Sequence, residues 1–153
     1  MTAPLALCVR HSRPGAQSVP ESVALRVPSD VNHVEAVVEL MIRHCFAGQS
    51  PSTRAVFRLR VALAEALANA ICSGNRQDPA KGVTVSAELL PDLIRLSVAD
   101  EGDGFDPATV LSPTDQDALE RECGRGLFII RNMALQVEFN ERGNIIWMTL
   151  PRC

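Results

Sequence analysis

Lysine is almost absent from this 153-residue chain. Lys81 is the only one, although lysine and arginine together number 15. A Walker A loop needs Gly-Lys-Ser/Thr, and a eukaryotic-type protein kinase needs a strand lysine on the phosphates. The Ala80-Lys81-Gly82 context fits neither pattern. Any ATP site in this chain therefore works without a phosphate-binding lysine.

Long hydrophobic runs and closely paired cysteines are also missing. No apolar run approaches the roughly 20 residues that a membrane-spanning helix needs. The formal net charge is -3 with no basic stripe, which argues against nucleic-acid or membrane partners. The five cysteines form no C-x-x-C pair, a usage that fits reduced thiols in a cytoplasm. We therefore expect one cytoplasmic domain over residues 1–153, with its core at about 20–150.

The order of hydrophobic patterns predicts an α+β fold. Alternating patterns at residues 5–10, 22–27, 83–89, 94–98, 135–140 and 144–150 predict strands. Helical spacing indicates one helix capped by Asp30, a second that opens at Ser50-Pro51 and ends near Gly74, and a short third after Gly126. Strand hairpins beside helices with one apolar stripe predict a two-layer sandwich. The polar segment from 100 to 124 is too long for a connector, so we expect a lid at about 105–123.

The first motif lies in the second predicted helix, at residues 61–71. Most of this stretch is apolar, yet Glu65 and Asn69 are four residues apart and share a face. Asn69 could give a neutral oxygen to Mg²⁺, and Glu65 could accept a proton from an attacking hydroxyl. The alternative is that both belong to a narrow solvated stripe with Arg54 and Arg58.

The second motif is the aspartate- and glycine-rich run 100–106, directly after a predicted strand. Its alternating glycines allow a sharp bend and the close approach of a ligand. Asp100, at the strand end, could accept a hydrogen bond from an amino group such as that of adenine. A plain surface turn or a calcium loop is the alternative, although the regular acidic run of an EF-hand is missing.

The third motif places Gly124 and Gly126 just before an apolar predicted helix. Free N–H groups at a helix N-terminus bind phosphate oxygens, which would compensate for the missing lysine. Arg125 adds a permanently charged fork that could reach a terminal phosphate, and Arg121 is a weaker candidate. The alternative is an ordinary helix entry with a solvated arginine.

Together and in this order, the three motifs resemble the N, G1 and G2 boxes of the GHKL ATPase superfamily. Within it, residues 20–150 resemble the anti-sigma-factor serine/threonine kinases through the strings Asn69-Ala70-Ile71, Gly74-Asn75, Gly102-x-Gly104-Phe105-Asp106-Pro107 and Gly124-Arg125-Gly126-Leu127. The resemblance implies the Bergerat ATP-binding fold, in which helices cover one face of a mixed, mostly antiparallel sheet.

The resemblance also implies roles for individual residues. Glu65 would be the general base and Asn69 the Mg²⁺ ligand, while Arg125 would contact the phosphates. The ATP-binding set would comprise Asn69, Ser73, Asp100, Gly102, Gly104, Phe105, Gly124, Arg125, Gly126, Leu127 and Thr149. In this set Asp100 would bind the adenine amino group and Thr149 would complete the adenine pocket. Ser73 stands where many members have a histidine.

The activity that follows from the resemblance is that of an ATP- and Mg²⁺-dependent kinase. It would phosphorylate a serine on a STAS-domain anti-anti-sigma protein and, in its other state, sequester a sigma factor. Homodimerisation is expected, without direct contact to nucleic acid or membrane. Two alternatives stay open: a nucleotide-sensing binding module without turnover, and a switch kinase that phosphorylates a scaffold in a stress-signalling complex.

Overall fold

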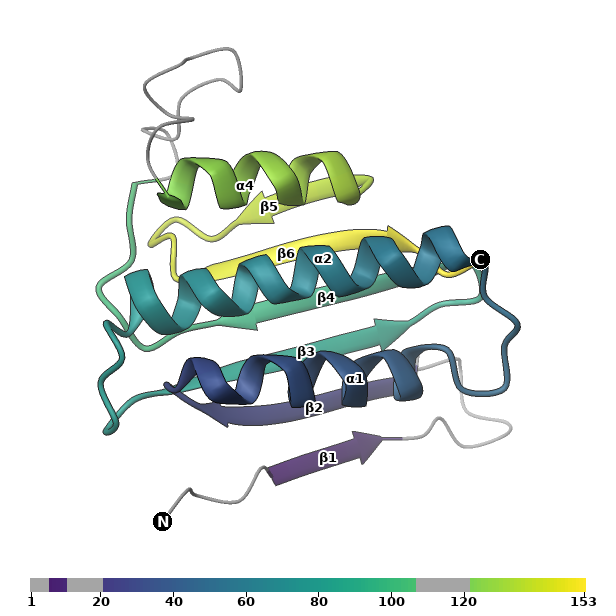
Figure 1. The fold of residues 1–153 in the computed structure, drawn as a ribbon, viewed down its shortest axis with the longest axis horizontal. Helices are drawn as coiled ribbons and strands as arrows, with labels where there is room; N and C mark the ends of the chain where they lie inside the picture. Colours follow the sequence, from purple (N-terminus) through teal and green to yellow (C-terminus); the bar gives the residue numbers. More distant parts are fainter. Residues whose placement is uncertain (1–5, 11–20, 107–121) are drawn as a thin grey trace.

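The computed structural model describes residues 6–10, 21–106 and 122–153, and in them six strands form a single sheet. The strand order is β1-β2-β3-β4-β6-β5 (Figure 1). The strands are β1 (Ala6–Arg10), β2 (Glu21–Pro28), β3 (Gly82–Leu89), β4 (Leu93–Ala99), β5 (Gln136–Phe139) and β6 (Ile145–Pro151). All five pairings are antiparallel, so the parallel pair that a mixed sheet would contain is not found among these strands.

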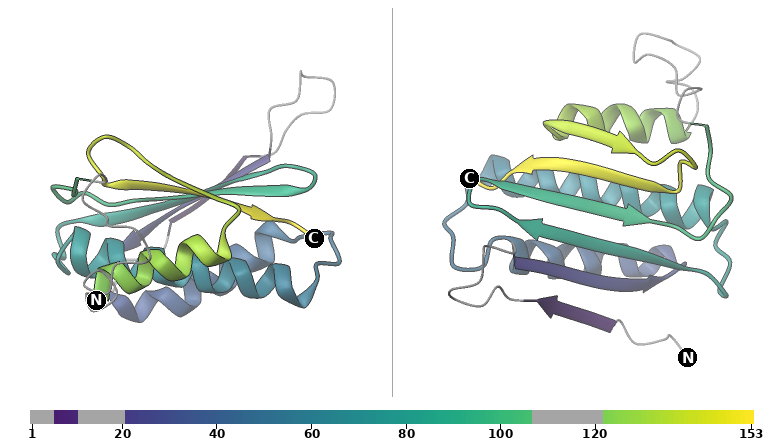
Figure 2. Two further views of the ribbon diagram at one scale, coloured as in Figure 1. Left: turned by 90° about the horizontal axis from the view of Figure 1, so that it is seen from above. Right: turned by 180° about the vertical axis from the view of Figure 1, so that it is seen from behind.

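In the described residues, three α-helices lie together on one face of the sheet (Figure 2). They are α1 (Val34–Cys45), α2 (Thr53–Asn69) and α4 (Glu122–Met133). The short helix η1 (Val31–His33) precedes α1, and the π-helix η2 (Ala70–Gly74) continues α2. The predicted two-layer α+β sandwich is therefore confirmed.

The hydrophobic core lies between the sheet and these helices. On β3, Val83, Val85, Ala87 and Leu89 are buried, which is the alternation expected of a strand with one covered face. The apolar stripe of α2 packs against the same core, with Leu59, Leu63 and Leu67 fully buried. Cys45 at the end of α1 is also buried, and burial raises the pKa of its thiol to about 12. No helix in the described residues is long and apolar enough to cross a membrane.

Two helix starts differ from the sequence-based predictions. α2 begins at Thr53, because the Ser52 hydroxyl accepts a hydrogen bond from the Ala55 N–H at 3.1 Å; Ser52, and not Ser50, is therefore the N-cap. α4 already includes Glu122, so Gly126 lies within the helix and not before it. Most of the expected lid, residues 107–121, lies outside the described residues.

Candidate functional site

The predicted site residues gather where three elements meet at one end of the molecule: the end of α2 with η2, the loop after β4, and the first half of α4 (Figure 1). α2 and α4 pack against each other, and Gly74 at the end of η2 lies against Asp100 after β4. The segment α2–η2, which carries the first motif, is therefore in contact with the loop of the second motif.

Glu65 and Asn69 lie one turn apart on α2 and face Gly126 of α4. A Cβ added to Gly126 would lie 3.0 Å from Asn69 Nδ2 and 3.2 Å from Glu65 Oε2, so both side chains point at the α4 backbone. Both are half-buried, which disfavours the alternative of a fully solvated stripe. Within the described part of the chain, neither side chain has a hydrogen bond or ion pair. Their polar atoms are therefore available to a ligand.

The α4 helix changes the expected phosphate site. The free N–H groups of a helix belong to its first turn, which here comprises residues 122–124. Gly124 lies in that turn, whereas Gly126 lies in the second turn and acts by lacking a side chain that would press on Glu65 and Asn69. Arg125 is exposed and Leu127 is buried in the core, so Leu127 supports the helix from beneath.

The π-helix η2 connects Asn69 to Gly74. Its wider turn is closed by the Asn75 N–H, which donates to the Ala70 carbonyl at 2.8 Å. Such π-helical insertions occur frequently at functional sites. Ser73 is exposed on this turn. A Cβ added to Gly74 would overlap the Asp100 carboxylate, so this glycine lets the carboxylate rest directly on the η2 backbone.

Asp100 is half-buried at the end of β4, and its carboxylate is fixed. Its Oδ1 accepts a hydrogen bond from the Gly102 N–H at 2.8 Å. Burial raises the pKa of Asp100, while the Gly102 N–H and the positive charges of Lys81 and Arg142 act in the opposite direction. A Cβ on Gly102 would overlap the Gly74 carbonyl oxygen. Because Gly74 and Gly102 lack side chains, the η2 backbone and the loop after β4 can approach each other closely beside Asp100.

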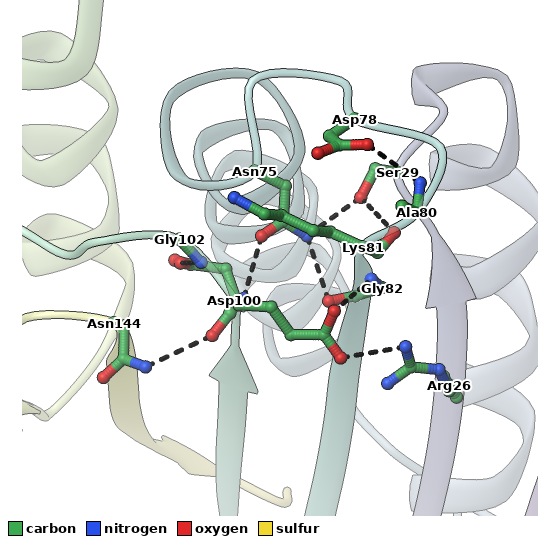
Figure 3. Close-up of polar contacts among 11 residues, drawn as sticks. Arg26, Ser29, Asn75, Asp78, Ala80, Lys81, Gly82, Asp100, Gly102 and Asn144 are labelled. Carbon is green, nitrogen blue, oxygen red and sulfur yellow. Dashed lines mark hydrogen bonds and ion pairs between the residues drawn. The ribbon is translucent and has the colours of Figure 1, made fainter.

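A network of hydrogen bonds ties this loop to neighbouring strands (Figure 3). The buried side chain of Asn75 accepts from the Glu101 N–H at 2.8 Å and donates to Ser29 Oγ and to the Gly82 carbonyl. The Glu101 carboxylate accepts from the Gly82 N–H at 3.0 Å and pairs with Arg26 at 2.8 Å. The Gly82 hydrogen bond and the Arg26 pair hold the pKa of Glu101 below its usual range.

The sequence reasoning assigned no role to Asn75 or to Asn144. Asn144, between β5 and β6, accepts at its backbone carbonyl from the Asp100 N–H at 2.9 Å and donates from Nδ2 to the Asp100 carbonyl at 3.2 Å. For Asn75, the one signal in the sequence is the Gly74-Asn75 pair, which contributes to the family resemblance. The partners of Asn75 lie 7, 26 and 46 residues away in sequence and on three different segments, so no local pattern could find them together.

The other end of the glycine-rich loop is anchored on the turn between β5 and β6. Gly104 and Gly143 both have positive φ, +78° and +74°. A Cβ on Gly104 would overlap the Arg142 carbonyl, and one on Gly143 would overlap the Phe105 carbonyl. Phe105 also packs edge-to-face on Phe139, with ring centroids 5.3 Å apart. The two glycines thus allow two backbone segments to cross at the point where the expected lid begins.

Thr149 is the one candidate that the structure separates from the others. In the β4–β6 register Thr149 pairs with Arg95, whereas Ile145 pairs with Ala99 next to Asp100. Four residues along a strand correspond to roughly 13 Å. Thr149 also alternates with the buried Met148 and Leu150, so its side chain lies on the sheet face away from the helices. A direct role for Thr149 beside Asp100 is not supported by this geometry.

The side chains that are brought together fit an adenine nucleotide and Mg²⁺. Within the described residues, no group of three or more His, Cys, Asp or Glu side chains could hold a metal ion. Asn69 offers a neutral oxygen, which fits Mg²⁺ because this ion takes most of its ligands from water and substrate phosphates. Asp100 offers a fixed acceptor for an amino group.

The chain belongs to the histidine kinase-like ATPase domain family, which matches residues 27–150. It is similar to the serine-protein kinase RsbW of Staphylococcus aureus strain JH9, with 29% identity over 141 residues, 87% of this chain and 88% of that protein. The RsbW proteins of strains Newman and JH1 give the same values. These matches confirm the predicted relationship to the GHKL ATPases and their serine-kinase branch.

Proposed function

We propose that this protein is an ATP- and Mg²⁺-dependent serine/threonine-protein kinase and anti-sigma factor. In this proposal it phosphorylates a serine on a STAS-domain anti-anti-sigma partner and sequesters a sigma factor. The family match supports ATP binding, and the similarity to serine-protein kinases named RsbW supports transfer to serine. The STAS partner, the sigma factor and the homodimer come from the resemblance of the motifs.

One observation carries the proposal: Glu65 and Asn69 are held against Gly126 without a partner among the described residues, on the same helical segment as Gly74. Gly74 in turn contacts Asp100. Asn69 and Gly74 are five positions apart, which is about one turn of the π-helix η2 with its i→i+5 bonding. An adenine nucleotide that reaches Asp100 with its base can therefore direct its phosphates toward Asn69 and Glu65.

The chemistry assigned to these residues is direct phosphoryl transfer. The serine Oγ of the partner forms a bond to the γ-phosphorus while the bond from that phosphorus to its bridging oxygen breaks, and ADP leaves. Glu65 accepts the proton of the serine hydroxyl. Asn69 would hold Mg²⁺ through its side-chain oxygen, and bound Mg²⁺ would neutralise phosphate charge.

The first turn of α4 and Arg125 complete the phosphate site in this proposal. Backbone N–H groups at a helix N-terminus favour anions, both as hydrogen-bond donors and through the helix dipole. Gly124 belongs to that turn, and the exposed Arg125 guanidinium is free to approach the terminal phosphate. This arrangement would replace the lysine of other ATP sites.

The decisive experiment is transfer of labelled γ-phosphate from Mg-ATP to the cognate STAS-domain protein. We expect a labelled serine with the unchanged protein and loss of labelling with Asn69→Ala. The control is Gln49→Ala, which also removes an amide but from an exposed position in the α1–α2 loop, and it should label normally. Unchanged labelling with Asn69→Ala would refute the assignment of the site.

Three further observations separate the alternatives. ATP binding and a stable partner complex without any labelled serine would favour a nucleotide-sensing binding module. A sigma factor that fails to co-elute with the protein in the presence of Mg-ATP would remove the anti-sigma part of the proposal. If a labelled serine appears on a scaffold of a stress-signalling complex, and not on the STAS partner, the switch-kinase alternative holds.

A further inference from the structure

We propose that Asn75 and Asn144 are positioning residues that hold the Asp100–Glu101 peptide group, and through it the Asp100 carboxylate, in the orientation that recognises an adenine amino group. We call these two residues the asparagine clamp. The inference rests on the proposed function, because it takes Asp100 as the residue that binds the base. It adds two residues to that site that the motifs did not assign.

The clamp holds both polar atoms of a single peptide group. The N–H of Glu101 donates to Asn75 Oδ1 at 2.8 Å, and the carbonyl of Asp100 accepts from Asn144 Nδ2 at 3.2 Å. The two asparagines approach from opposite directions, Asn75 from the end of η2 and Asn144 from the β5–β6 turn (Figure 3). A peptide group is planar, so fixing its N–H and C=O fixes its plane.

Each asparagine is in turn fixed by other parts of the fold. Asn75 is 1% exposed, and its amide donates to Ser29 Oγ at 2.8 Å and to the Gly82 carbonyl at 3.0 Å. On the other side, Asn144 Oδ1 accepts from Asn140 Nδ2 at 2.6 Å. Hydrogen-bonded amides hold a defined orientation, and for the buried Asn75 breaking one of these bonds would leave a polar atom unpaired.

The orientation of this peptide determines where the Asp100 carboxylate points. Asp100 donates its own N–H to the Asn144 carbonyl, so the backbone is held on both sides of its Cα. Its Oδ1 then accepts from Gly102 N–H two residues later. Loss of the clamp would let the peptide rotate, and the carboxylate would meet an amino group with poorer geometry. Hydrogen bonds weaken steeply as their angle decreases.

The test compares ATP with purine riboside triphosphate, which lacks only the 6-amino group. In the unchanged protein, we expect the dissociation constant of the analogue to exceed that of ATP by about tenfold or more, since a hydrogen bond to a charged acceptor is lost. Asn75→Ala and Asn144→Ala should each reduce this ratio at least about threefold, as a misaligned hydrogen bond discriminates less. Asp100→Ala lacks the acceptor altogether, so its ratio of the two dissociation constants should be near one and serves as the reference.

A structural role alone would change stability without changing this ratio. Ser86→Ala is the matched control, because it removes a side-chain hydrogen bond, the one to Ser97 on the neighbouring strand, without touching Asn75, Asn144 or the Asp100–Glu101 peptide. We expect it to lower the melting temperature and to keep the ratio of the unchanged protein. If Asn75→Ala does not fold, Asn144→Ala decides alone, since it keeps the backbone bond from Asp100 N–H to the Asn144 carbonyl.

The outcomes distinguish this inference from the proposed function. A large ratio in the unchanged protein that persists in Asn75→Ala and Asn144→Ala overturns the clamp and leaves the nucleotide site intact. A ratio near one in the unchanged protein overturns the assignment of Asp100 as the base-binding residue, and the clamp with it. A reduced ratio in Ser86→Ala equal to that in Asn75→Ala would also overturn the clamp, because any loosening of the core would then suffice.

Discussion

The two ends of the candidate site differ in how far their polar groups are already engaged. At the base end, around Asp100, the polar groups are hydrogen-bonded to the protein through Gly102, Asn75 and Asn144. At the phosphate end, Glu65 and Asn69 lie against Gly126 and have no hydrogen bond within the described residues. The base end is built before a nucleotide arrives, whereas the phosphate end keeps its polar atoms free.

This difference follows from what each end has to do. A base is recognised by a few hydrogen bonds of fixed direction, and a rigid acceptor gives the best discrimination against an analogue that lacks the donor. In the proposed function the phosphate end binds a metal ion and accepts a proton, so its oxygen and carboxylate atoms cannot be committed to the protein. Changes at the two ends should therefore separate binding from transfer.

The largest expected effect is on transfer, in Glu65→Gln. Glutamine keeps the size of the side chain but cannot act as the general base. We expect the rate of phosphate transfer to fall about 10²- to 10⁴-fold, with an ATP dissociation constant that changes less than about twofold. Single-turnover labelling and equilibrium binding measure the two quantities. Glu35→Gln, an exposed position in the first turn of α1, is the control, and comparable losses of transfer in both variants would contradict a specific role.

The second prediction concerns the base end and is Gly102→Ala. The added methyl group would overlap the Gly74 carbonyl oxygen, a backbone atom that cannot move without shifting η2. We expect the free energy of unfolding to fall by about 1–3 kcal/mol and ATP affinity to fall about tenfold or more. Chemical denaturation and binding isotherms test this.

Gly82→Ala is the matched control for Gly102→Ala. Its methyl group would meet the guanidinium of Arg26, the end of a flexible and exposed side chain, which can move away. The loss of the exposed Arg26–Glu101 ion pair should cost at most about 1 kcal/mol. If Gly82→Ala weakens ATP binding as much as Gly102→Ala, close packing on Gly74 is not the reason that position 102 is glycine.

Much of the fold could be predicted from the sequence because its signals are local. The alternation of Val83, Val85, Ala87 and Leu89 needs no knowledge of the partner strands to indicate a strand with one buried face. The spacing of Glu65 and Asn69 likewise places them on one side of a helix, and the structure shows what that side contacts.

The remaining features depend on contacts between distant segments. The start of α4 at Glu122 changes Gly126 from a donor of a free N–H into a close-packing position, which no local pattern distinguishes. Thr149 fails as a partner of Asp100 because strand register, which is set by pairing with β4, separates them. In the sequence, Asn75 is one polar residue among others in a loop. Its hydrogen-bond partners lie at the ends of β2, β3 and β4, and only the folded chain brings these three strand ends together.

The third prediction, Gly126→Ala, tests the phosphate end with a smaller effect. Alanine is favoured over glycine within a helix by about 1 kcal/mol, so the protein should be as stable or slightly more stable. The new methyl group would lie 3.0 Å from Asn69 Nδ2 and 3.2 Å from Glu65 Oε2, and both side chains would have to shift by a few tenths of an ångström. We expect transfer to fall about three- to tenfold. Unchanged transfer would mean that the catalytic geometry tolerates this displacement.

The smallest expected effect is the pH dependence of stability that Asp100 contributes. Burial raises the pKa of Asp100 in the folded protein, so the unfolded chain loses its proton first as pH rises. The folded state then binds more protons than the unfolded state. The free energy of unfolding therefore falls as the pH rises from the ordinary carboxyl pKa to the raised pKa of Asp100.

Asp100→Asn removes this titration and keeps an oxygen for the Gly102 N–H. Relative to the unchanged protein, its melting temperature should therefore increase across that interval and stay higher at neutral pH, while ATP binding weakens. A melting temperature below that of the unchanged protein at neutral pH would show that the negative charge of Asp100 stabilises the base end, contrary to the cost of its burial.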